Sequence, residues 1–145
     1  RYFVQDFKYI EASLVKGKNY WRLVSARPIH ELNSIKSLTT TSRIRGLQLI
    51  GKLAPEEEPH EHLFTELVAA YTYTRGAHPS SDAIESIEAL LALKILHALG
   101  YWGDEQADNM LVASPFDFDS IEKIKATRKS IIKELNKSLA ATQLM

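Results

Sequence analysis

The stretch Asp82-Ala-Ile-Glu-Ser-Ile-Glu-Ala-Leu-Leu-Ala-Leu-Lys-Ile-Leu-His-Ala-Leu-Gly100 is the most apolar segment of this 145-residue chain. Its large aliphatic residues recur at three- and four-residue steps, which is the period of an α-helix. Asp82 and Glu85 form a capping-box pattern at its start, and Gly100 is a typical helix stop. A helix that is apolar around most of its circumference is usually buried. We therefore expect residues 82–99 to form the central helix of a bundle.

Three other segments share the helical period. The first follows the capping residues Thr39–Ser42, and we expect close packing at its two glycines, Gly46 and Gly51, because each weakens a helix by about 1 kcal/mol relative to Ala. The second covers His60–Tyr73, and the third begins at Asp119 or Ser120 and ends near Leu139. The apolar positions expected to face the core are Ile44, Leu47, Ile50, Leu53, Leu63, Phe64, Leu67, Val68, Tyr71, Ile121, Ile124, Ile131, Leu135 and Leu139.

The first thirty residues carry a strand pattern instead. Aromatic and β-branched residues predominate up to Val15, a turn follows at Lys16–Asn19, and Tyr20–Val24 is again strand-like. A two-stranded hairpin alone is marginal in water, so we expect further strands of its sheet to lie before Arg1. The predicted fold class is α+β, with a β-hairpin followed by an all-α helical bundle.

The register of this hairpin follows from its turn. If Lys16 pairs with Asn19, Leu14 lies opposite Trp21, and we expect Trp21 to be buried among apolar neighbours. The predicted apolar face consists of Ile10, Ala12, Leu14, Trp21 and Leu23.

The formal net charge of zero hides two opposed parts of the chain. Residues 1–52 hold ten Lys/Arg and three acids, a net charge of +7, and residues 53–145 hold eight bases and fifteen acids, a net charge of −7. Such asymmetry marks the basic part as a candidate for binding a polyanion.

Several classes of function are disfavoured by the sequence. The chain has no cysteine, which excludes disulfides, thiolate zinc sites and a thiol nucleophile. No phosphate-binding glycine motif, nucleophile elbow, membrane-spanning run or signal peptide is present. His60 and His62 point to different sides of a helix, and Glu56–Glu58 is a typical solvated helix start. We expect no catalytic residues, no metal and no cofactor, and a small hydrolase based on these residues is the weakest alternative.

The positive evidence is electrostatic. Lys16, Lys18 and Arg22 surround the hairpin turn beside Tyr20, and basic residues with an aromatic ring suit phosphates and bases of single-stranded nucleic acid. A lysine-rich tip that only prevents edge pairing is the equally weighted alternative.

Two helices carry further candidates. Arg43 and Arg45, near the expected start of the first helix, oppose its dipole and are candidates for phosphate contacts. The basic last helix is a second candidate surface, for which the solvated face of a terminal helix is the stronger interpretation. Its bases are Lys123, Lys125, Arg128, Lys129, Lys133 and Lys137.

The order of these segments resembles the RecO family of bacterial DNA-repair proteins. The similarity lies in the hairpin Leu14-Val-Lys-Gly-Lys-Asn-Tyr-Trp-Arg-Leu23, the segment Glu58-Pro-His-Glu-His-Leu-Phe64 and the run Ala89-Leu-Leu-Ala-Leu-Lys-Ile-Leu-His-Ala-Leu-Gly-Tyr101. The resemblance implies that residues 1–28 are the last strands of an OB-fold and that residues 29–145 form the helical domain. Many members carry a four-cysteine zinc site after the Leu-Gly-Tyr helix. This chain lacks it, so we expect packing to hold residues 101–118.

The resemblance also implies a function. It implies a cytoplasmic, nucleoid-associated, non-enzymatic mediator of DNA repair and recombination that responds to DNA damage. Such a mediator binds single- and double-stranded DNA, anneals strands and helps load a recombinase. Its implied partners are a RecR-like protein and the acidic C-terminal tail of single-stranded DNA-binding protein. The alternative is a helical protein-interaction module without direct nucleic-acid binding.

Overall fold

The computed structural model describes residues 10–29, 38–55, 58–103 and 109–143; within these ranges the side chains of residues 38–44, 109 and 143 are not described. The strand pattern before Ile10, the side chain of Arg43 and the residues Glu56 and Glu57 therefore lie outside the described part. The elements are β1 (Ile10–Lys16), β2 (Trp21–Pro28), α2 (Leu38–Leu53), α3 (Glu61–Ala77), α4 (Ser81–Ala98), α5 (Asn109–Val112) and α6 (Phe118–Gln143).

This order confirms an α+β chain in which an antiparallel hairpin precedes helices. The contacts divide the chain into two compact units, Arg1–Lys36 and Ser37–Met145, and each unit is described by itself. That the first unit belongs to an OB-fold stays a prediction. In the described part of the chain, no helix is both long and apolar enough to cross a bilayer.

The hairpin forms, but its predicted register was wrong. Lys16 pairs with Trp21 and Leu14 with Leu23, so the turn holds four residues, and the amide of Gly17 donates to the carbonyl of Tyr20 at 2.9 Å. The shift is two residues on the second strand, and a shift of two leaves every side chain on its expected face. Alternation alone therefore could not distinguish the two registers.

The predicted burial of Trp21 was also wrong. Its side chain is 49% exposed, and Leu14 and Leu23 on the same face are 54% and 44% exposed. The pairing of the two strands shifts between Leu14 and Ser13. Leu14 pairs with Leu23 and Ser13 pairs with Ser25, which leaves Val24 as an extra residue on β2. This is the two-against-one arrangement of a β-bulge, which increases the local twist of a strand pair.

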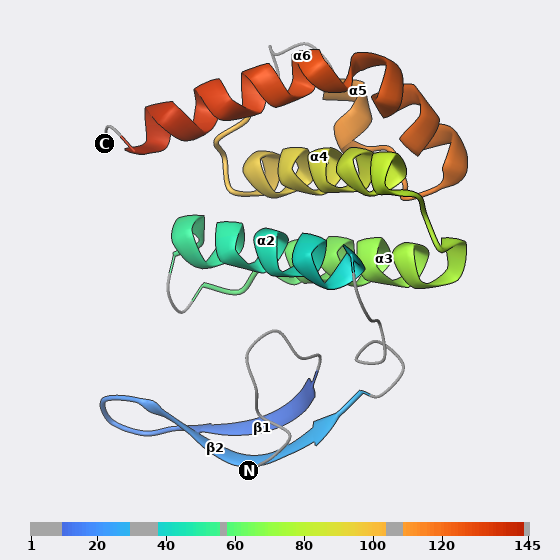
Figure 1. The fold of residues 1–145 in the computed structure, drawn as a ribbon. Helices are drawn as coiled ribbons and strands as arrows, with labels where there is room; N and C mark the ends of the chain where they lie inside the picture. Colours follow the sequence, from blue (N-terminus) through green and yellow to red (C-terminus); the bar gives the residue numbers. More distant parts are fainter. Residues whose placement is uncertain (1–9, 30–37, 56–57, 104–108, 144–145) are drawn as a thin grey trace. The chain divides into compact units, whose positions relative to one another are not determined.

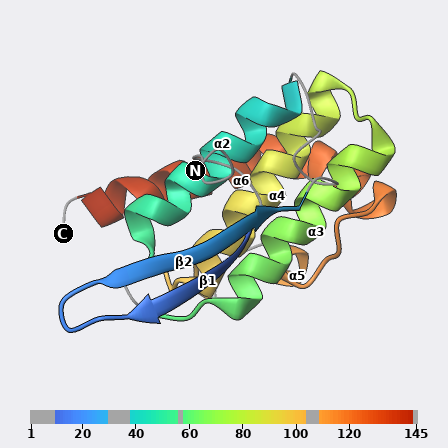
Figure 2. The ribbon, with the colours of Figure 1, turned by 90° about the horizontal axis from the view of Figure 1, so that it is seen from below.

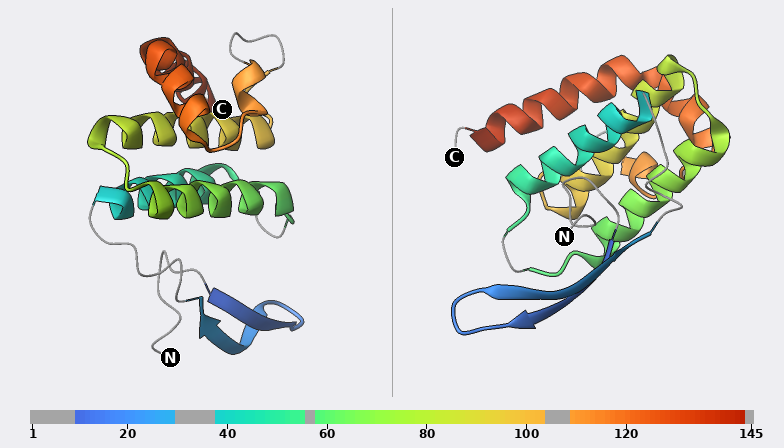
Figure 3. Two further views of the ribbon diagram at one scale, coloured as in Figure 1. Left: turned by 90° about the vertical axis from the view of Figure 1, so that its right-hand side faces the viewer. Right: turned by 60° about the horizontal axis from the view of Figure 1, so that its bottom comes forward.

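The helical unit consists of three layers. Figure 1 and the left view of Figure 3 show α4 in the middle, with α2 and α3 on one side and α5 and α6 on the other, and Figure 2 shows α4 from below, behind α2 and α3. The helix pairs in contact agree, because α4 packs against each of α2, α3, α5 and α6. The central place predicted for the helix over 82–99 is thereby confirmed.

The composition of α4 explains its position. Its side towards α6 contributes Leu90, Leu93 and Leu96 to one core cluster, and its other side contributes Leu91 and Ile95 to a second cluster with α3. All five of these side chains are at most 3% exposed. A helix with one apolar stripe could not serve two layers, so the apolarity around α4 dictates its place between them.

The ends of the helices confirm one prediction and correct two. Gly100 ends α4 with φ +82°, and the amides of Gly100 and Tyr101 donate to the carbonyls of His97 and Leu96, which is the Schellman arrangement. The start of α4 is capped by the Ser80 hydroxyl, which accepts from the amide of Ala83, and not by Asp82.

The cap of α6 also lies earlier than predicted. The Asp117 carboxylate accepts from the amide of Ser120 at 2.8 Å, so neither Asp119 nor Ser120 provides the cap. This hydrogen bond, the largest contribution, lowers the pKa of Asp117 below its usual value.

Packing at the predicted core positions is mostly as expected. Ile121, Ile124, Ile131 and Leu135 of α6 are at most 5% exposed. Gly46 is buried, and a Cβ there would lie 2.9 Å from Cδ2 of Leu91, which confirms close packing. Gly51 is exposed with nothing within 4 Å of a Cβ, so the same expectation was wrong there. Phe64 was expected in the core and is 51% exposed instead.

Candidate nucleic-acid interface

The tip of the hairpin places a cation against an aromatic ring. Lys16 ends β1 directly opposite Trp21, and its Nζ lies 5.3 Å from the centroid of the Trp21 ring. This distance is within the range of a cation–π interaction. Trp21 is half exposed at the same time, so one face or edge of the indole remains accessible to a ligand.

The other predicted residues lie around this pair and not on one face. Arg22 lies opposite Val15 and therefore on the reverse face of the hairpin from Trp21. Lys18 and Tyr20 belong to the turn itself, and Tyr20 is 71% exposed. Within the described residues, no carboxylate pairs with Lys18 or Arg22. Both charges are therefore available to a ligand that wraps the tip.

The remaining charges of the hairpin neutralise each other. Arg27 on β2 pairs across the strands with Glu11, and both its Nε and its Nη2 contact Oε2 of that carboxylate. The open end of the hairpin therefore carries a neutral pair, and the net positive charge is concentrated at the turn. Sequence reasoning identified the basic cluster but not the accessible indole, because it assumed that apolar neighbours across the strands would bury Trp21.

Arg45 belongs to the helical unit and has a different environment. It lies in the middle of α2, since that helix begins at Leu38, so the expectation that it opposes the helix dipole at the first turn was wrong. Its Nη1 lies 3.1 Å from Oε2 of Glu88 on α4, and the Arg45 side chain is 65% exposed. A phosphate at this position would compete with Glu88 for the guanidinium.

A shallow groove lies beside this ion pair. Gly46, Leu49 and Leu91 form an apolar floor between α2 and α4, and the groove has a volume of about 240 Å³. Arg45 and Glu88 line its polar side, and Ala92 completes the lining. The missing side chain of Gly46 is what lets the two helices approach here.

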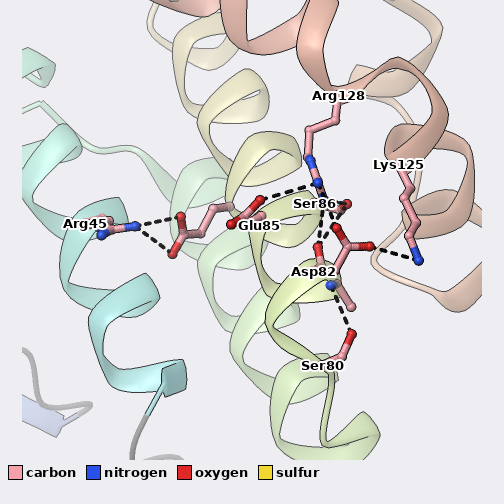
Figure 4. A network of polar contacts seen from close by, with 9 residues as sticks. Arg45, Ser80, Asp82, Glu85, Ser86, Lys125 and Arg128 are labelled. Atoms are coloured by element: carbon pink, nitrogen blue, oxygen red, sulfur yellow. Dashed lines mark hydrogen bonds and ion pairs between the residues drawn. The ribbon is translucent and has the colours of Figure 1, made fainter.

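A polar network joins α6 to the start of α4, as Figure 4 shows. Nη2 of Arg128 lies 2.7 Å from Oδ1 of Asp82, and its Nη1 donates to the Asp82 carbonyl at 2.8 Å and to the Ser86 hydroxyl at 3.2 Å. Nζ of Lys125 lies 2.9 Å from Oδ2 of Asp82. The hydrogen bonds from Lys125 and Arg128, in that order, lower the pKa of Asp82, and Asp82 raises the pKa of Lys125. Two bases of α6 therefore have structural partners.

Lys94 is a buried cation that the sequence reasoning overlooked. Its side chain is 4% exposed, and its Nζ lies 3.0 Å from Oε2 of Glu66 on α3 and donates to the carbonyl of Val112 at 2.9 Å. The ring centroid of Phe116 lies 5.4 Å from the same Nζ. Together with Trp102, which is 3% exposed, these contacts hold the described part of residues 101–118 by packing, as expected for a chain without cysteines.

The two histidines of the alternative hydrolase site differ in environment. Nε2 of His62 lies 3.7 Å from Oε1 of Glu66, and the His62 side chain is 76% exposed. Nε2 of His60 is buried without a hydrogen-bond partner among the described residues. In the same part of the chain, no three His, Asp or Glu side chains gather in a group that could hold a metal ion.

No family model, curated protein or solved structure matches this chain. The resemblance to the RecO family therefore rests on the sequence motifs alone.

Proposed function

We propose that the protein binds single-stranded DNA with the tip of its hairpin and acts as a non-enzymatic mediator of DNA repair and recombination. The observation that carries this proposal is the half-exposed indole of Trp21, held beside Lys16 at the end of the hairpin and flanked by the exposed Tyr20. Exposed rings beside cations provide the two kinds of contact, stacking and charge, that a single strand of nucleic acid uses.

The proposed contacts divide into two kinds. Tyr20 and Trp21 stack on bases, and stacking of a base on an aromatic side chain contributes about 1–3 kcal/mol. Lys16, Lys18 and Arg22 contact phosphates, and these contacts are salt-dependent because they release counterions from the strand. In this proposal the protein also binds double-stranded DNA, anneals strands and helps load a recombinase together with a RecR-like partner.

A salt titration tests the phosphate contacts. Binding of a fluorescent oligothymidine to the full chain is measured between 50 and 300 mM salt, and the slope of log K against log salt is compared among variants. Each single-strand phosphate contact contributes about 0.7 to this slope, so the triple variant Lys16→Ala, Lys18→Ala and Arg22→Ala is expected to lower its magnitude by about 2. An unchanged slope and affinity would overturn the proposal.

The chain offers a matched control for this variant. Glu11→Ala with Arg27→Ala removes a cation and the carboxylate that neutralises it, on the same hairpin, and leaves the net charge unchanged. This double variant is expected to keep the slope of the native protein. A fall in slope equal to that of the triple variant would mean that any change in the hairpin disturbs binding, and would contradict the assignment to the tip.

A second candidate function is supported by the groove between α2 and α4. Its apolar floor and the exposed Arg45 suit an acidic peptide with an aromatic end, such as the implied tail of single-stranded DNA-binding protein, whose carboxylate would replace Glu88 as the partner of Arg45. In this alternative the helical unit is a protein-interaction module. A labelled acidic peptide ending in Phe is expected to bind the native chain but not Ala92→Phe, which fills the groove. Ala98→Phe, on the exposed end of the same helix, is the control, and equal binding by all three proteins would refute this function.

A further inference from the structure

Three lysines form a row along α6. Lys129, Lys133 and Lys137 follow each other at four-residue steps, so they lie on one side of the helix, and all three are exposed. The rest of the segment 123–137 contributes three more bases and one acid, Glu134, which is half-buried. The row lies in the part of the chain whose overall charge is negative, so it is a local reversal of sign.

Internal partners do not account for this row. Lys125 and Arg128 take up the carboxylate of Asp82, and Arg128 also lies 3.4 Å from Oε2 of Glu85. Among the described residues, no carboxylate lies within ion-pair distance of Lys129, Lys133 or Lys137. Like charges at four-residue steps repel each other, so the row destabilises an isolated helix.

The helix dipole does not account for the row either. A cation near the C-terminus of a helix is favourable, but the effect falls off within the last turn. The last turn of α6 contains no basic residue, and the row lies further inside the helix. The repulsion within the row is therefore not offset by contacts among the described residues, and a ligand of negative charge would offset it.

The spacing of the row fits a nucleic-acid strand. Four residues of an α-helix rise about 6 Å, and two nucleotides of a DNA strand advance about 6.8 Å along the duplex axis. The three lysines can therefore contact every second phosphate of a strand, namely the first, third and fifth of about five successive phosphates. Most exposed residues around the row are small or polar, namely Ala126, Ser130, Asn136 and Ala140, and they let a backbone approach closely; beside them lies Ile132, a large apolar side chain that is 39% exposed. A membrane-surface helix would need a broad face of several large apolar residues beside its bases, and Ile132 alone does not make one.

We propose that Lys129, Lys133 and Lys137 of α6 form a second track of phosphate contacts for a DNA strand, on the helical unit. The proposal does not depend on the hairpin tip, because the row belongs to the other compact unit of the chain.

The test uses the full chain with three lysines replaced. The triple variant Lys129→Gln, Lys133→Gln and Lys137→Gln is expected to lower the magnitude of the salt slope for oligothymidine by about 2, at about 0.7 per contact. The variant with Arg at all three positions keeps the charges and is expected to keep the slope. Lys123→Gln is the control, because it removes one exposed base of α6 that lies outside the row. One phosphate contact contributes about 0.7 to the slope, so this variant is expected to change the slope by less than about 0.5. Circular dichroism and thermal unfolding check that the Gln variant retains its helices.

The outcomes separate this proposal from the hairpin proposal. If the Gln variant of α6 keeps the native slope while the Ala variant of the hairpin has a lower slope, the proposal for the α6 row is overturned and the proposal for the hairpin tip is supported. If only the α6 variant loses slope, the row is supported and the hairpin proposal fails. Binding of the native chain and the Gln variant of α6 to vesicles with 30% phosphatidylserine is measured as well. If the Gln variant loses vesicle binding but no DNA binding, the assignment of the row to DNA is overturned.

Discussion

Replacing Lys94 by Met is expected to destabilise the helical unit strongly. The exchange keeps the length of an unbranched side chain and removes the charge, the hydrogen bond to Val112 and the ion pair with Glu66. The carbonyl of Val112 and the carboxylate of Glu66 then lose their partner in a site where Lys94 itself is 4% exposed. Among the ion pairs of the described residues, the one with His62, at 3.7 Å from the other carboxylate oxygen, then remains for Glu66.

The magnitude follows from the burial of the two partners. Removing one member of a buried ion pair costs about 3–5 kcal/mol. Glu66 is 18% exposed and can recover part of its hydration, so we expect the lower end, about 3 kcal/mol. For a domain of this size the urea dependence of the unfolding free energy is about 1–1.5 kcal/mol per molar, so the midpoint of urea unfolding is expected to fall by about 2 M.

A double variant separates the missing charge from the altered packing. Lys94→Met with Glu66→Leu replaces both ions by apolar side chains, and such replacements are often close to neutral. The double variant is therefore expected to unfold at a higher urea concentration than Lys94→Met alone. Urea unfolding followed by far-UV circular dichroism measures both midpoints. A urea midpoint of Lys94→Met within about 0.5 M of the native midpoint would refute this reasoning. At about 1–1.5 kcal/mol per molar, such a shift corresponds to less than about 1 kcal/mol of unfolding free energy.

Two further predictions concern stability. The folded pKa of Asp82 is lowered from 3.8 by Lys125 and Arg128, so its contribution is fully present above pH 3.8 and is lost as the pH falls through the lower folded value. Urea midpoints measured between pH 6 and pH 2 are expected to fall less steeply below pH 3.8 for Asp82→Asn than for the native protein, and parallel curves would contradict the network. Gly100→Ala is expected to cost about 1–2 kcal/mol because φ is +82° there, whereas Gly51→Ala, in an exposed helix position, is expected to stabilise by up to about 1 kcal/mol. Thermal unfolding measures the change in melting temperature for each variant. If both variants shift it in the same direction, either the helix propensity at Gly51 or the backbone strain at Gly100 has been misassigned.

Patterns that depend only on neighbouring residues were readable from the sequence. The apolarity around residues 82–99 predicted both the helix α4 and its central place, and Gly100 predicted where it ends. The stripe from Ile121 to Leu135 predicted the buried face of α6. Alternation in the hairpin predicted which side chains share a face, since that property depends only on the two-residue period. None of these required knowledge of which segments meet.

Tertiary structure decided which charges remain available. No local pattern indicates that Arg128 reaches the start of α4, that Lys94 is buried against Glu66, or that Arg45 pairs with Glu88. Each pairing joins residues on different helices, and the sequence carries no local record of such distances. The exposure of Trp21 likewise depends on what covers the hairpin and not on its strand pattern. The candidate DNA-binding cations could therefore be named from composition, but only the packing of α4 against α2 and α6 showed that Arg45, Lys125 and Arg128 have internal partners.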